Sequence, residues 1–152
     1  MVNVMTQLHP ASANERIIGP MIALARCTPQ DRIIVAGSKA IELVFALEAR
    51  GYLRAAPTGN CGHPTKQYRV ALVDWRQRSL QALETTLDWL VDYLNSAAVL
   101  VVWVDPQKPA ANQNLQAALQ THGFRVEAGS AYEYGFAISA RRLESAPISQ
   151  AA

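Results

Sequence analysis

The segment 31–52 constrains the fold of this chain more than any other. A short β-branched run, 33–36, is followed by Gly37-Ser38 and then by apolar residues at helical spacing. Gly51 stands where a glycine commonly ends a helix. A strand that passes through a tight glycine turn into a helix is a repeating unit of layered α/β proteins. The free N–H groups at the start of such a helix also favour an anionic ligand.

The rest of the chain repeats this alternation of strand and helix. The expected elements are helix 14–26, strand 33–36, helix 38–50, short edge strand 52–56, strand 68–73, helix 80–94, strand 97–104, helix 111–122 and two closing strands, 124–129 and 134–142. The helix at 14–26 contains Gly19-Pro20, where we expect a kink or a later start. Strands alternating with helices predict right-handed crossovers and a mostly parallel sheet with helices on both faces.

Length and composition agree with one α/β domain. The chain has 152 residues, of which 50% are hydrophobic and 17% charged, as suits buried parallel strands. We expect a loosely ordered or disordered N-terminus at 1–13, a single domain at 14–143 and a tail at 144–152. No apolar run reaches the ~20 residues of a membrane helix. Two cysteines without an export signal predict a cytoplasmic protein with reduced thiols.

Three segments carry a resemblance to a known family. They are the helix containing 115–119 with the Gly123-Phe124 turn, the closing strand 135–142, and the strand 68–75. Together they resemble the class I S-adenosylmethionine-dependent methyltransferases, and the resemblance spans about 17–143. It implies a Rossmann-like sheet that finishes with an antiparallel strand inserted beside the previous one. It also implies S-adenosylmethionine as the cofactor, with the end of 68–75 facing the transferred methyl group.

The chain departs from this family where the cofactor is held. Gly37 matches the first glycine of the family's cofactor loop, but Lys39 and Ile41 occupy the next two glycine positions. A β-carbon at these positions projects into the volume that glycine keeps free. The stretch 52–59 also lacks the acid that holds the ribose hydroxyls, and the interval before Tyr68 is too short for the usual extra helix and strand. The sequence therefore predicts a shortened member with a degenerate loop and weak or lost cofactor binding.

The candidate cofactor-binding residues are Gly37, Ser38, Lys39 and Asp74. Asp74 ends a predicted strand at the edge where open α/β sheets bind ligands, and it is equally placed to cap the following helix. No catalytic residue is assigned. We predict no metal site, because Cys61-Gly62-His63 and the scattered cysteine and histidines elsewhere do not give three or four ligands at a recognised spacing.

A different class of protein also matches part of the sequence. The segment 38–54, followed by 67–70, is similar to a winged helix-turn-helix, and the first half of the chain carries the excess of positive charge. A recognition helix presents polar groups to base edges, however, whereas the exposed side here includes Phe45, Ala46 and Ala49. This reading also leaves 75–143 unexplained, so nucleic acid is not expected as a partner.

Three functions follow from these readings. The preferred one is a methyltransferase-like binding or assembly module with weak or lost S-adenosylmethionine binding. The alternatives are an active methyltransferase on an unknown acceptor and a winged-helix DNA-binding protein. The partner is left open as a small molecule or a protein, including a second copy of the chain in a homodimer. No membrane partner is expected.

Overall fold

The computed structural model describes residues 13–37, 39–58, 66–76, 79–104, 109–132 and 135–143. In chain order these residues form α2 (Ala13–Ala25), β1 (Ile33–Gly37), α3 (Ala40–Ala49), β2 (Ala55–Pro57), β3 (Tyr68–Asp74), α4 (Leu80–Leu90), β4 (Leu94–Val104), α5 (Pro109–Thr121), β5 (Phe124–Tyr132) and β6 (Gly135–Arg142). The alternation of strand and helix predicted from the sequence is confirmed.

The strands form one six-stranded sheet in the order β2-β1-β3-β4-β6-β5. Strand β1 pairs in parallel with β2 and β3, and β3 pairs in parallel with β4. Strand β6 is inserted between β4 and β5 and is antiparallel to both. The predicted α/β fold, a mostly parallel sheet with a C-terminal antiparallel strand beside the previous one, is therefore confirmed.

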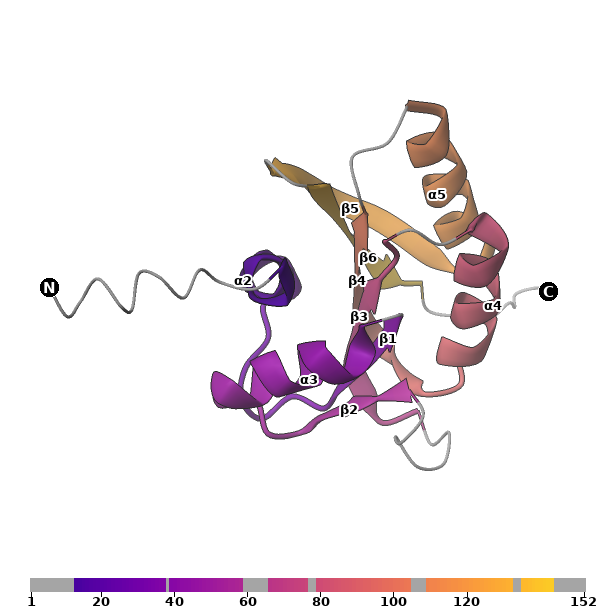
Figure 1. The fold of residues 1–152 in the computed structure, drawn as a ribbon. Coiled ribbons are helices and arrows are strands. Elements are labelled where there is room, and N and C mark those ends of the chain that lie inside the picture. The colour runs from indigo at the N-terminus through magenta and orange to yellow at the C-terminus, as the bar shows by residue number, and fades with distance from the viewer. Residues whose placement is uncertain are drawn as a thin grey trace, which may run out of the picture.

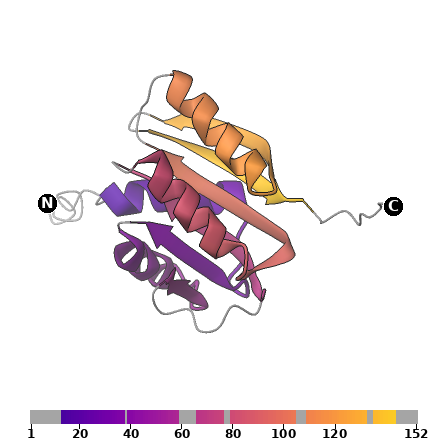
Figure 2. The same ribbon diagram turned by 90° about the vertical axis from the view of Figure 1, so that its right-hand side faces the viewer.

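Helices cover both faces of the sheet, as predicted. Figure 1 shows the sheet close to edge-on, with α2 and α3 on one side and α4 and α5 on the other. Figure 2 looks onto the second side, where α4 and α5 lie in front of the strands. The molecule thus has three layers, and each face of the sheet packs against its own pair of helices.

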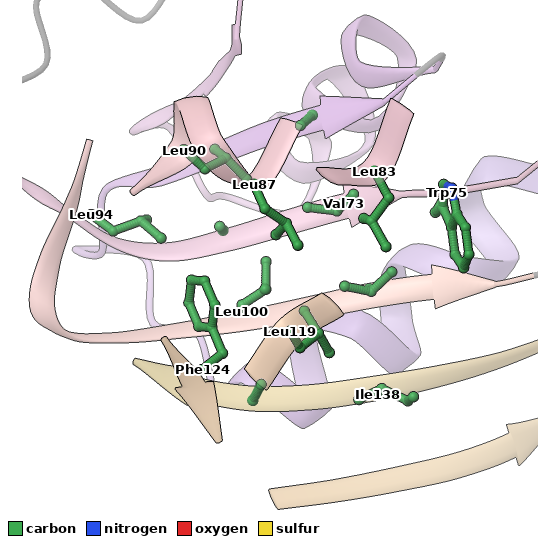
Figure 3. Packing of buried hydrophobic residues seen from close by; sticks show 14 of the residues in the cluster. Val73, Trp75, Leu83, Leu87, Leu90, Leu94, Leu100, Leu119, Phe124 and Ile138 are labelled. Carbon is green, nitrogen blue, oxygen red and sulfur yellow. The ribbon is translucent and has the colours of Figure 1, made fainter. Parts of the chain in front are cut away.

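The core between the sheet and α4 and α5 is built from the leucine row of α4. Leu83 and Leu87 of α4, together with Leu119 of α5, meet Val73 of β3 and Leu100 of β4 (Figure 3). All five side chains are buried. The spacing of three and four residues places the α4 leucines on one side of that helix. The leucine row of α4 is therefore part of the core.

The opposite face of the sheet packs against α2 and α3. Ile17 and Met21 of α2 and Leu43 and Leu47 of α3 are buried against the strands, where they contact a cluster that includes Val70. Because side chains alternate across a strand, neighbouring residues of β1, β3 and β4 contribute to the two cores in turn. Both faces of the central strands are therefore apolar, which explains their continuous hydrophobic runs.

The boundary between α4 and β4 differs from the prediction. The leucine spacing predicted a helix over 80–94, but α4 ends at Leu90 and Leu94 begins β4. The Tyr68 N–H donates to the Tyr93 carbonyl at 2.9 Å, and Tyr68 lies opposite Leu94 in the parallel ladder. Pairing with a distant strand overrides the local helical spacing here.

The short edge strand begins three residues later than expected. It was predicted over 52–56 and is found at 55–57, at the edge of the sheet as expected. The Tyr52 N–H donates to the Leu47 carbonyl at 3.0 Å, which keeps this residue in the turn that closes α3. Gly51 in that turn has φ +93°, in agreement with the predicted glycine cap.

The winged-helix alternative is wrong. The segment proposed as a recognition helix forms α3 and leads into β2 of the same sheet.

Helix α2 begins at Ala13 and runs through Pro20, so it does not start at that proline. No helix among the described segments is long and apolar enough to cross a membrane.

Candidate functional site

The predicted site residues meet at the carboxyl ends of two neighbouring strands. Gly37 ends β1, Asp74 ends β3, and the two lie opposite each other in the parallel ladder. Lys39 follows at the start of α3. The structure therefore brings Gly37, Lys39 and Asp74 to the edge where open α/β sheets bind ligands. Ser38 lies outside the described residues.

Gly37 is required by the packing of the two strands. Its φ is +118°, a backbone conformation that residues with a side chain rarely adopt. A β-carbon there would overlap the Asp74 carbonyl oxygen and would lie 2.9 Å from the Asp74 Cβ. The contact that demands a glycine at this position is thus one within the protein itself.

Asp74 is fully buried and is held by an arginine two residues later. The Arg76 Nε donates to Asp74 Oδ1 at 2.7 Å, and Nη2 donates to Oδ2 at 2.8 Å. The Arg76 backbone N–H adds a third hydrogen bond to Oδ1 at 3.2 Å. A two-pronged guanidinium–carboxylate pair of this kind fixes both carboxylate oxygens in place.

Asp74 does not cap the helix that follows it. The N-cap of α4 is Ser79, whose hydroxyl accepts a hydrogen bond from the Ala82 N–H at 3.1 Å. Sequence reasoning missed Arg76 as a member of the site. The only sequence signal was an opposite charge two residues beyond a strand end, which does not specify a bidentate contact.

The start of α3 is a weakly capped helix end. Lys39 occupies the N-cap and is exposed, and its own side chain makes no capping hydrogen bond. Serine, threonine, asparagine and aspartate are the residues that favour this position. Ile41, the second departure from the family's glycines, lies in the first turn with 57% of its surface exposed. The helix end thus presents a cationic and an apolar side chain where the family has glycines.

A groove opens between α3 and the edge strand β2. It has a volume of about 460 Å³ and is lined by Ile41, Val44, Phe45, Glu48, Ala55, Ala56 and Pro57. We call it the α3–β2 groove. Ile41, predicted to project into the cofactor volume, lines this groove.

The described residues contain no group of histidine, cysteine and acidic side chains that could hold a metal ion. Cys61 and His63 lie outside the described residues. Cys27 is a free thiol, and burial, aided by the negative charge of Asp31, raises its pKa to about 12. A thiol that stays protonated at neutral pH is a poor nucleophile.

Comparison with known proteins identifies the fold. No protein-family model matches the chain, and neither does any curated protein. Among solved structures, the [4+2]-cyclase SpnF superposes with a TM-score of 0.60 at 10% identity, over 86% of this chain and 82% of the cyclase. A SAM-dependent methyltransferase from Aquifex aeolicus gives a TM-score of 0.57 at 8% identity, over 88% of this chain and 91% of its own.

A third solved structure contains a bound ligand. The 1,6-didemethyltoxoflavin-N1-methyltransferase of Burkholderia thailandensis, with bound 1,6-didemethyltoxoflavin and S-adenosylhomocysteine, gives a TM-score of 0.59 at 11% identity. The match covers 93% of this chain and 83% of that enzyme. The chain therefore has a Rossmann-like fold of the class I methyltransferase type, at an identity that establishes the fold alone.

Proposed function

We propose that this chain is a methyltransferase-like binding or assembly module with weak or lost affinity for S-adenosylmethionine. The observation that carries the proposal is the state of Asp74. It ends the strand that resembles the family's methyl-facing strand, yet its carboxylate is fully buried and both oxygens are bound to Arg76. A buried carboxylate held in this way is not free to accept a hydrogen bond from a ligand.

The neighbouring residues support the same proposal. Gly37 has a positive φ, and the Asp74 backbone leaves no room there for a β-carbon, so the one glycine retained from the family's loop has a structural reason. Lys39 and Ile41 add side chains at the start of α3. Strand β2 and the residues around it, 52–59, contain no acid to bind ribose hydroxyls.

The fold itself does not require methyl transfer. One of the similar structures bears the name of a [4+2]-cyclase. Function therefore has to be inferred from the site and not from the fold. We assign the module to the cytoplasm because Cys27 is a free thiol, which suits a reducing compartment.

The test is a melting curve in millimolar S-adenosylmethionine or S-adenosylhomocysteine. A ligand at 100 times its Kd adds about 2.7 kcal/mol to the free energy of unfolding, and each kcal/mol raises the Tm of a domain of this size by roughly 2–4 °C. A working site therefore gives a shift of several degrees. We expect little or no shift for the unmodified protein. The variant carrying Lys39→Gly and Ile41→Gly is expected to recover some binding.

A large shift that saturates with S-adenosylhomocysteine concentration contradicts the proposal and favours the alternative of an active methyltransferase. Arg76→Lys offers a second readout. If the buried pair is what withholds Asp74 from ligands, replacing the two-pronged guanidinium by an ammonium weakens that pair and alters any residual ligand-induced shift. If a shift is measurable, equal shifts in both proteins would show that the Asp74–Arg76 pair does not limit ligand binding.

A further inference from the structure

We propose that the α3–β2 groove binds a basic amphipathic helix of a partner protein. The proposal rests on the assembly role proposed above and supplies the kind of partner for it. The groove lies beside the edge strand of the sheet; it shares Ile41 with the start of α3, but neither Gly37 nor Asp74 lines it.

The first argument is the apolar surface that the groove exposes. Phe45 is 62% exposed and Ile41 57% exposed, and the two residues lie one helical turn apart on α3. The wall opposite them is formed by Ala55, Ala56 and Pro57 of β2. A contiguous apolar patch of this kind on a small protein commonly marks an interaction surface.

The second argument concerns the backbone of the edge strand. Strand β2 is three residues long, and Pro57 has no N–H to donate. A partner strand added to this edge gains few hydrogen bonds. A helix satisfies its own backbone groups and needs only a hydrophobic groove for its apolar side, so a helix is the better match.

The third argument is the charge around the groove. Glu48 is the one charged residue in the lining, and Glu42 is exposed on the same helix. Of the cations on or next to α3, the Arg50 guanidinium lies beside Gly19 of α2, and the Arg54 guanidinium donates to the Gln30 carbonyl at 3.0 Å. Lys39 stands at the N-cap of α3, outside the lining. The lining is therefore apolar with a single, negative charge at Glu48, which favours a partner carrying lysine or arginine.

The same charges argue against a second copy of this chain as the occupant. A two-fold contact places identical patches against each other. Because Glu48 is the one charged residue in the lining, such a contact brings two negatively charged patches together and supplies no cation from within either patch. A basic helix from another protein has no such penalty.

The experiment uses two designed helical peptides as probes. Both carry the same stripe of leucine and phenylalanine, and their polar positions are all lysine in one peptide and all glutamate in the other. Binding to the unmodified chain is measured by fluorescence anisotropy at physiological salt. We expect the lysine peptide to bind about tenfold or more tightly than the glutamate peptide.

Three variants locate the binding site. Phe45→Ser is expected to weaken the lysine peptide by about tenfold or more, and Glu48→Lys is expected to reverse the preference toward the glutamate peptide. Leu143→Ser is the matched control, because Leu143 is an exposed apolar residue, 46% accessible, outside the groove. It should leave both affinities unchanged. Circular dichroism checks that each variant folds, which is expected since all three positions are exposed.

Several outcomes overturn the proposal. These are no binding of either peptide at millimolar concentration, equal affinity for both peptides, or a loss of affinity with Leu143→Ser as large as that with Phe45→Ser. A dimer in analytical ultracentrifugation that Phe45→Ser dissociates would assign the groove to a second copy. A cofactor-induced melting shift with the peptide preference intact would refute only the proposed function, whereas failed peptide binding without a melting shift would refute only this inference.

Discussion

Gly37 and Asp74 lie opposite each other on neighbouring parallel strands, so close that a β-carbon on Gly37 would overlap the Asp74 carbonyl oxygen. The same aspartate is held through its side chain by Arg76. One residue thus contacts β1 through its backbone and the following turn through its carboxylate. The carboxyl edge of the sheet is built as a packed structural unit, and its residues can be tested by their effect on stability.

Gly37→Ala should destabilise the fold by about 2 kcal/mol or more, through the combined cost of a positive φ and of overpacking against Asp74. Urea unfolding monitored by circular dichroism measures this loss. Gly51→Ala is the matched control. Gly51 also has a positive φ, +93°, but a β-carbon there meets no atom within 4 Å, so its cost should stay near 1 kcal/mol. Equal losses for the two variants would show that the contact with Asp74 is unimportant.

Arg76→Met should lower the free energy of unfolding by about 3 kcal/mol, because it leaves the fully buried Asp74 without its cation. Adding Asp74→Asn should recover part of this loss, and a double-mutant cycle on urea-unfolding data gives the coupling. The comparison pair is Asp31–Arg69, joined at 3.1 Å with a more exposed arginine. Arg69→Met should cost no more than about 1 kcal/mol. A similar loss in the free energy of unfolding for both variants would mean that the burial of Asp74 does not strengthen its pair with Arg76.

The partly buried thiol of Cys27 should make stability fall at alkaline pH. Burial raises its pKa to about 12 in the folded state, from an ordinary value of 9.0. Below pH 9 the thiol is protonated in both states and the free energy of unfolding is unaffected. Above pH 9 the unfolded chain releases the proton while the folded chain keeps it, so stability decreases as the pH rises from 9 toward 12. Urea unfolding at a series of pH values measures the decrease.

Other groups titrate in the same range, so the informative quantity is the difference between the unmodified protein and Cys27→Ala. Above pH 9 the free energy of unfolding of the unmodified protein should fall relative to that of Cys27→Ala, and a difference that stays constant with pH would contradict the raised pKa of the thiol. A second measurement uses alkylation in a Cys61→Ser background. Iodoacetamide should react slowly with the native chain at pH 8 and rapidly after unfolding in urea.

The sequence alone predicted the architecture, because each layer leaves a local pattern. The uncharged run 99–104 indicated a strand covered on both faces, and it lies in the centre of the sheet. Leucines at helical spacing from Leu80 to Leu90 indicated the apolar side of α4. The closing segments, including Gly123 and the strand 135–142, carried the resemblance to the methyltransferase family, and that resemblance implied the antiparallel insertion that the structure confirms. These patterns are readable because they depend on residues only a few positions apart.

The tertiary structure decided what depends on residues far apart in the chain. Leu94 continues the helical spacing, yet its pairing with Tyr68 assigns it to β4. The sequence indicated Gly37 and Asp74 as candidate site residues. It did not indicate that the Asp74 backbone lies so close to position 37 that only glycine fits there. Nor did it indicate that Ile41 lines a groove with β2. In each case the deciding contact joins neighbouring elements of the fold, and the distance between them is set by packing of the whole sheet, which no local pattern records.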